Sequence, residues 1–254
     1  MKALKVAVLS AVAILILASA KAEAYPILQL DIIGGHYDAA TQTIVSSNTD
    51  FTLVAVLTPK TNKPVAPYLA DTYYISAAVS PEHGPTDSSL GSFTWNGSNY
   101  LVTEDMTYGV PPLEMGSATT DPGDLAPHSI FPTFFSEFSF QFSPANRTVT
   151  YNTADNPGGL TPTSATTNVS YFAMFNITSA LVGSNVLHFD LYNSYVLSCK
   201  KTRTCTYDED IEIFAPFSHD AESSVHSVAE PQSMLAMSVG LLVAARALRR
   251  EKRA

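Results

Sequence analysis

The chain has 254 residues, 46% of them hydrophobic, and its 14 basic and 23 acidic residues give a net charge of −9. This length suits one folded domain with a sizeable core. The acidic surplus excludes a protein that holds nucleic acid or an anionic membrane surface by charge attraction, because both would repel it.

Residues 1–24 are typical of a secretion signal. They comprise a basic start at Lys2 and Lys5, an apolar run over residues 6–18 and a small-x-small cleavage site at Ala22-Glu23-Ala24. Cleavage there would leave Tyr25 as the mature N-terminus, with Ala18-Ser19-Ala20 as a second candidate site and an uncleaved anchor as the alternative. We therefore expect the Sec export machinery to carry this protein out of the cytoplasm.

Residues 25–220 are expected to form one all-β domain, a β-sandwich or a jelly-roll-like barrel. Apolar, aromatic and β-branched residues predict strands over residues 27–33, 51–57, 72–79, 138–142, 171–177, 186–192 and 211–214. Helical periodicity is confined to the two ends, which are expected to form a signal helix and a short hydrophobic helix. About nine or ten short strands in one domain are typical of sheets packed face to face.

The clearest local prediction is a β-hairpin over residues 92–101. Asn96-Gly97 separates two runs of alternating residues, and this dipeptide tolerates the positive φ angles of a type I′ turn. The flanking runs can therefore pair directly.

A long loop is expected over residues 103–129, which contain Pro111-Pro112 and an Asp-Pro-Gly-Asp turn at residues 121–124. Loops of this length are uncommon unless they bind a ligand or are disordered. Asp121 and Asp124 are interpreted as turn residues and not as ligands.

Cys199 and Cys205 enclose a small basic loop, Lys200-Lys201-Thr202-Arg203-Thr204. In an oxidising exported compartment this spacing predicts a disulfide that pins a turn between two strands. Two thiols without a neighbouring Cys or His pair do not make a metal site. The basic loop is either a solvated turn or a contact for an acidic polymer.

The strongest candidate for a ligand site is acidic and consists of Asp208, Asp210, Glu212 and Asp220. In a strand, Asp210 and Glu212 would share one face. Several carboxylate oxygens suit Ca²⁺, which takes six to eight oxygen ligands, although the EF-hand series is absent. An acidic strand edge that discourages aggregation explains the same residues without a ligand. The sequence thus predicts no obligatory cofactor, and Ca²⁺ is the candidate ion.

Catalytic motifs are absent from the sequence, which has no Gly-x-Ser-x-Gly elbow, His-Glu-x-x-His helix or phosphate-binding loop. Ser218-His219-Asp220 has the residue types of a hydrolase triad, but neighbours in a strand or turn point in different directions and predict no relay. His188 lies in a strand pattern and is interpreted as a packed or partnered side chain. Glycosidase carboxylates depend on a spatial separation that the sequence leaves open. We expect no enzyme activity.

The C-terminal end is typical of a sorting tail. A polar stalk, residues 221–232, ends in the Glu230-Pro231 motif, and residues 233–254 comprise an apolar run followed by basic residues that include Arg246, Arg249 and Arg250. The apolar stretch of about 15 residues is shorter than the roughly 20 that span a bilayer. The basic end should stay in the cytoplasm. We expect a transient membrane anchor that is cut near Glu230-Pro231.

These two ends resemble bacterial PEP-CTERM proteins, in which an exosortase recognises a Pro-Glu-Pro motif, a hydrophobic helix and an Arg-rich end. Ala229 stands in place of the first proline, so Glu230-Pro231 carries the match. The body is similar to the "choice-of-anchor N" family over residues 25–31, 71–77, 105–109 and 214–222. The resemblance implies an exosortase-type processing enzyme in a Gram-negative-type bacterium, and it implies no biochemical activity.

The exported part is far more acidic than the whole chain. Residues 25–231 contain six basic and 21 acidic residues, a net charge of −15, because eight of the 14 basic residues lie in the two ends. Such a charge attracts cations or keeps the domain soluble.

Two functions remain open from the sequence. The first is a non-catalytic surface or extracellular-matrix protein, held at the cell envelope or released, and associated with extracellular polysaccharide. The second is a Ca²⁺-assisted carbohydrate-binding module with exposed aromatic sugar platforms, for which the candidates are Trp95, Tyr73, Tyr74, Tyr100 and Tyr108. The second function requires several of these rings to be coplanar and exposed on one face, whereas the first expects them buried or scattered.

Overall fold

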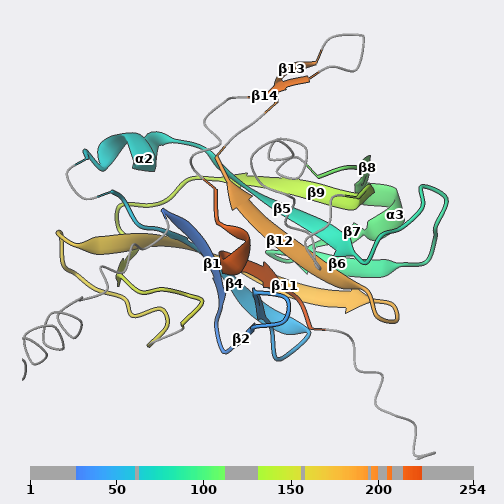
Figure 1. Cartoon of the computed structure of the whole chain (residues 1–254), viewed down its shortest axis with the longest axis horizontal. Coiled ribbons are helices and arrows are strands. Elements are labelled where there is room, and N and C mark those ends of the chain that lie inside the picture. The colour runs from blue at the N-terminus through green and yellow to red at the C-terminus, as the bar shows by residue number, and fades with distance from the viewer. Residues whose placement is uncertain are drawn as a thin grey trace, which may run out of the picture.

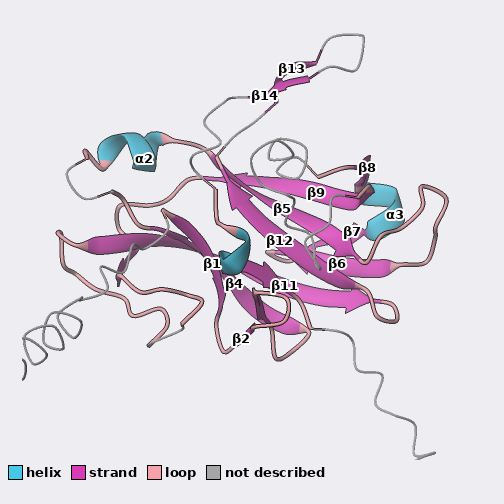
Figure 2. Cartoon of the chain, viewed as in Figure 1, coloured by secondary structure: helices cyan, strands magenta, loops and turns pink. Residues whose placement is uncertain are grey.

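The computed structural model describes residues 27–60, 63–111, 131–155, 158–193, 196–199, 205–207 and 214–224. This part of the chain is mostly β, with two multi-strand sheets that share one hydrophobic core (Figures 1 and 2). The architecture is consistent with the predicted β-sandwich.

One sheet has six strands in the order β1–β4–β11–β6–β7, with β10 paired to the beginning of β11. The pairings between its described strands are all antiparallel. The long strand β11 is central, because β4 pairs along one edge while β10 and β6 pair along the other. The strands are β1 Leu28–Ile32, β4 Asp50–Leu57, β6 Gly91–Trp95, β7 Ser98–Leu101, β10 Arg147–Val149 and β11 Val169–Leu181.

The other sheet has seven strands in the order β2–β3–β15–β12–β5–β9–β8. β15 pairs with β3 in parallel and the other pairings described in this sheet are antiparallel, so the sheet is mixed. The strands are β2 His36–Asp38, β3 Thr43–Val45, β5 Tyr73–Ser80, β8 Thr107–Gly109, β9 Thr133–Phe140, β12 Val186–Tyr192 and β15 Asp220–Glu222. A separate two-stranded sheet is formed by β13 Val196–Cys199 and β14 Cys205–Tyr207.

The core lies between the two large sheets. Leu30 of β1, Leu53 of β4 and Phe175 of β11 come from the first sheet, and Ile75 of β5 and Phe189 of β12 come from the second. Each is at most 7% exposed. Burial of a side chain of this size contributes roughly 1.5–3 kcal/mol, so this cluster is the main source of stability.

The predicted hairpin is confirmed. Trp95 lies opposite Ser98, and φ is 49° at Asn96 and 84° at Gly97, as a type I′ turn requires. The predicted strand over residues 186–192 also matches β12 at both ends.

The strand predicted over residues 138–142 is wrong at both boundaries. β9 spans Thr133–Phe140, so it begins five residues earlier and ends two residues earlier. Phe142 is 2% exposed beyond the end of the strand, and its ring packs on Tyr73 with centroids 4.8 Å apart. Phe142 is apolar because it packs in the core, and this extends the alternating pattern in the sequence beyond the true end of the strand.

The predicted loop over residues 103–129 is wrong at its beginning. A helical turn, α3 Val102–Asp105, is followed by β8, which pairs with β9. A strand of three residues is too short to show a clear period-two pattern in the sequence. Its extended conformation depends on pairing with the neighbouring strand. Two further short helices are α2 Ala66–Ala70 and the 3-10 helix η1 Phe217–His219.

The signal segment, the sorting tail and residues 112–130 lie outside the described residues. The strand predicted over residues 211–214 lies outside them too, except Phe214, which forms an isolated bridge to Tyr192. Within the described ranges, no helix has both the length and the apolar character needed to cross a bilayer.

Candidate functional site

Strand β12 places polar side chains on one face and apolar side chains on the other. Leu187, Phe189 and Leu191 belong to the core between the sheets. Side chains alternate along a strand, so His188 and Asp190 lie on the opposite face of the seven-stranded sheet.

Strand β15 brings carboxylates to the same face. Ala221 belongs to the core, which places Asp220 and Glu222 on the face away from it. The antiparallel register sets His188 opposite Glu222 and Phe189 opposite Ala221. Residues more than 30 positions apart in the chain thus meet across two paired strands.

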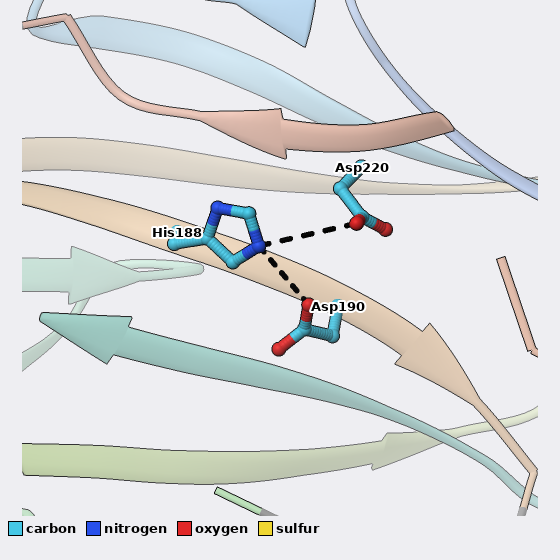
Figure 3. Close-up of side chains that lie close together, drawn as sticks. All are labelled: His188, Asp190 and Asp220. Atoms are coloured by element: carbon cyan, nitrogen blue, oxygen red, sulfur yellow. Dashed lines mark hydrogen bonds and ion pairs between the residues drawn. The ribbon is translucent and has the colours of Figure 1, made fainter. Parts of the chain in front are cut away.

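Figure 3 shows the His188 imidazole directed between the Asp190 and Asp220 carboxylates. Its Nε2 lies 3.1 Å from Oδ1 of Asp190 and 3.9 Å from Oδ2 of Asp220, while Nδ1 lies 3.9 Å from Oε2 of Glu222. One ligand atom from each of His188, Asp190 and Asp220 lies within 4.8 Å of the others. We call these three residues and Glu222 the His188 cluster.

The His188 cluster is buried. The side chains of His188, Asp190 and Asp220 are 0% exposed, and that of Glu222 is 12% exposed. Burial lowers the pKa of the His188 imidazole, but the carboxylates of Asp190, Glu222 and Asp220 outweigh it and hold that pKa well above its ordinary value. The cluster therefore favours a positive charge at its centre.

Buried polar atoms in the His188 cluster are incompletely paired. Oδ2 of Asp190 and Nδ1 of His188 form no hydrogen bond. Ser76 lies opposite Asp190 across β5 and β12, is fully buried, and its hydroxyl also forms no hydrogen bond. A buried polar atom without a partner costs about 1–3 kcal/mol, so this arrangement needs an explanation.

The structure places one of the four predicted acidic ligands in this cluster. Asp220 belongs to it, whereas Asp208, Asp210 and Glu212 lie outside the described residues. His188 and Asp190 were not predicted as ligands, because their partner is far away in the sequence. The one local signal is the alternation of His188 and Asp190 with apolar residues in a fully buried strand.

The other predicted site residues are only partly described. Cys199 lies opposite Cys205 in the pairing of β13 with β14. The side chains of these two cysteines are not among the described parts of the structure, so the disulfide stays a prediction. The sorting residues Glu230, Pro231, Arg246, Arg249 and Arg250 also lie outside it.

The geometry at Ser218-His219-Asp220 differs from the sequence expectation. Oγ of Ser218 lies 2.8 Å from Nδ1 of His219, and Nε2 of His219 lies 2.7 Å from Oδ1 of Asn152. The expectation that Ser218 and His219 point apart is wrong, since the backbone turns there as η1. Asp220 contacts His188 instead and does not complete a triad.

The Ser218–His219–Asn152 arrangement is a poor general base. His219 is 8% exposed, and burial lowers its pKa to about 4. A general base works best when its pKa lies near the working pH. At neutral pH this imidazole is neutral and a weak proton acceptor.

The aromatic rings considered as sugar platforms pack against other aromatic rings. Trp95 stacks on Phe138 with centroids 4.0 Å apart and planes inclined by 7°, and Tyr73 is 0% exposed. The remaining pairs are Tyr74 with Tyr192, Tyr100 with Phe93 and Tyr108 with Phe134. Trp95 and Tyr73 therefore contribute to the core.

Comparisons with protein-family models, curated proteins and solved structures find no match to this chain.

Proposed function

We propose that this protein is an exported, non-catalytic surface or extracellular-matrix protein, anchored briefly in the membrane and processed near Glu230-Pro231. The signal segment and the tail support export and sorting. An exosortase-type enzyme and the Sec machinery are its processing partners, and extracellular polysaccharide is the material it would lie among. The β domain is the part that is displayed or released.

The packing of the aromatic rings carries the choice between the two candidate functions. A sugar platform needs flat rings exposed side by side, whereas Trp95 and Tyr73 are 7% and 0% exposed. Tyr100 stacks on the buried Phe93 with centroids 5.2 Å apart. This arrangement favours a structural domain over the Ca²⁺-assisted carbohydrate-binding module.

The chemistry-bearing groups also favour a non-catalytic role. His188 and Asp190 have no exposed side-chain surface for a substrate to reach. His219 is a weak base. Labelling of wild-type protein, but not Ser218→Ala, by a fluorophosphonate probe would show an activated serine and contradict this part of the proposal.

The sorting part can be tested in the native host by replacing both Glu230→Ala and Pro231→Ala. We expect the wild-type protein to lose its tail and reach the cell surface or medium, while the double variant keeps the tail and stays in the inner membrane. Cell fractionation followed by mass measurement of the purified protein distinguishes these outcomes.

Gln232→Ala is the matched control, because it changes the neighbouring residue and leaves Glu230-Pro231 intact. It should be processed as the wild-type protein is. Equal processing of the double variant and the wild type would show that Glu230-Pro231 is not a recognition motif.

A further inference from the structure

We propose that His188, Asp190 and Asp220 bind one divalent transition-metal ion, with zinc as the best fit, and that this ion holds strand β15 in the seven-stranded sheet. The proposal rests on the geometry of the His188 cluster and is independent of the sorting tail. It names a different ion from the Ca²⁺ site expected from the acidic sequence, and of the residues of that site it keeps only Asp220.

The distances fit a small cation. Zinc binds imidazole nitrogen and carboxylate oxygen at about 2.0–2.2 Å, which places tetrahedral ligand atoms roughly 3.3–3.5 Å apart. Nε2 of His188 lies 3.1 Å and 3.9 Å from the nearest oxygens of Asp190 and Asp220. All three ligand atoms lie within 4.8 Å of one another, so side-chain rotations that shift the carboxylate oxygens by up to about 1 Å would complete a zinc triad.

A cation explains the polar contacts better than a proton does. Nε2 of His188 can carry one hydrogen, yet it faces two carboxylates. The second oxygen of Asp190 is buried without a hydrogen bond, and so is the hydroxyl of Ser76 opposite it. A metal ion can accept several oxygen ligands at once, which a single N–H cannot.

Glu222 is placed to orient the imidazole. It lies near Nδ1, the ring nitrogen on the other side from Asp190 and Asp220, at 3.9 Å. Metal-bound histidines usually donate their other N–H to a carboxylate, which fixes the tautomer and aims the free nitrogen at the metal. Glu222 is therefore a positioning residue in this proposal and not a ligand.

The mixed donor set favours zinc over Ca²⁺ or Mg²⁺. Those two ions prefer oxygen ligands in shells of six or more, whereas zinc accepts nitrogen and oxygen in a shell of about four. Two carboxylates neutralise the double charge of the ion, and the Ser76 hydroxyl or a water would supply the fourth ligand. Full burial of His188 and Asp190 indicates a structural role, because catalytic zinc keeps an open position.

The ion would connect the end of the domain to its centre. β15 has three residues, and two of them, Ala221 and Glu222, fall within the range predicted as the polar stalk, so the strand extends the folded domain beyond its predicted end at residue 220. His188 and Asp190 lie on the longer β12, which pairs along its whole length with β5. Binding Asp220 to these side chains would hold β15 between β12 and β3.

The test begins with the full-length chain, purified, freed of metal with a chelator and dialysed. We expect one equivalent of Zn²⁺ to bind by titration calorimetry, with a rise in melting temperature of about 5–10 °C at a hundredfold excess over the dissociation constant. Equal amounts of Ca²⁺ and Mg²⁺ should leave the melting temperature unchanged. A spectrum with Co²⁺ in place of zinc should lack thiolate charge-transfer bands, which separates this site from Cys199 and Cys205.

Two near-isosteric variants, Asp190→Asn and Asp220→Asn, should each weaken zinc binding at least tenfold. The matched control is Asp87→Asn. Asp87 also pairs with a histidine, His83, at 3.0 Å, but its side chain is 45% exposed, and the other ring nitrogen of His83 faces the amide oxygen of Asn185. This control should bind zinc as the wild type does. The double variant Cys199→Ser with Cys205→Ser should also retain binding.

The wild-type measurement alone can overturn the proposal, even when a variant does not fold. Failure of the folded, metal-free protein to bind Zn²⁺, with no change in melting temperature, would show that the His188 cluster is a buried imidazolium network. Binding of Ca²⁺ in preference to Zn²⁺ would overturn the choice of ion. Zinc binding that is lost with the cysteines and kept in Asp190→Asn would place the metal elsewhere.

Discussion

Asp31 is a buried acid of a different kind from those of the His188 cluster. It is 3% exposed on β1, where Oδ2 accepts a hydrogen bond from the Tyr151 hydroxyl at 2.8 Å and Oδ1 accepts one from the Ile32 N–H at 2.8 Å. Burial raises the pKa of the Asp31 carboxyl, and the two hydrogen bonds only partly offset this effect. The fold therefore favours the protonated form.

Replacing Asp31→Asn should change how stability depends on pH. Because the folded-state pKa is raised, Asp31 contributes stability below its unfolded pKa of about 3.9, and that contribution is lost as pH rises through the folded pKa. The asparagine variant does not ionise. Its free energy of unfolding, compared with wild type, should therefore rise as pH increases from about 4 towards 7, measured by urea unfolding at each pH.

Asp87→Asn provides a control of opposite sign. The Gly84 N–H and the His83 side chain lower the pKa of the Asp87 carboxyl. The Asp87 carboxylate therefore contributes to stability above its unfolded pKa, and this contribution is lost as pH falls through the folded pKa. The contribution is small because the side chain is exposed to solvent. If the free energy of unfolding of Asp87→Asn, compared with wild type, rose with pH as much as that of Asp31→Asn, the pH dependence could not be assigned to the buried Asp31 carboxyl.

At the scale of the strand, Gly91 decides how β6 joins β11. Its φ is +100°, and it lies opposite Leu181 in the antiparallel register. A Cβ atom at this position would overlap the backbone carbonyl of Ala180 and lie 2.8 Å from the Leu181 Cα. Backbone atoms cannot move aside as a flexible side chain can, so only glycine fits here.

Gly91→Ala should destabilise the protein by about 4 kcal/mol or more, the range of exceptional single substitutions. Gly97→Ala is the matched control, since Gly97 has a φ of +84° but nothing within 4 Å of the added Cβ. The control should cost only the backbone strain, about 1–2 kcal/mol. Equal losses in chemical denaturation would contradict the close contact between β6 and β11.

The sequence predicts well those elements whose conformation is determined by residues close together in the chain. The hairpin at Asn96-Gly97 depends on one turn type, and five of the seven residues of β12 are aliphatic or aromatic. β2, β3 and β8 have three residues each, and their order comes from neighbouring strands. No short window of sequence contains that information.

The His188 cluster could not be predicted for the same reason. Asp220 follows a group of acidic residues in the sequence, and for this reason the sequence predicts a site that combines it with Asp208, Asp210 and Glu212. Its contact with His188 depends on β15 lying between β12 and β3, with parallel pairing to β3. The polar face of β12 could have indicated a buried charge, but the pattern alone does not identify its partner.

At the scale of the whole molecule, we propose that the two ends and the domain have separate tasks. The ends contain eight of the 14 basic residues and, in our proposal, direct export and sorting, while residues 25–231 have a net charge of −15. The domain packs aromatic rings such as Phe93 and Phe189 into its core, and its acidic charge would help to keep it soluble after the export that we propose. This division agrees with the proposed role of the domain as a stable, non-catalytic protein displayed at the cell surface or in the extracellular matrix.

The most direct test of this account is the intact mass of the mature protein from its native host. We predict a chain that begins at Tyr25 and ends near Glu230-Pro231, without the apolar run and the basic residues that follow. The same chain made in the cytoplasm of a host without the processing enzyme should keep its tail. A mature mass equal to the full 254 residues would contradict both export by signal cleavage and processing of the tail.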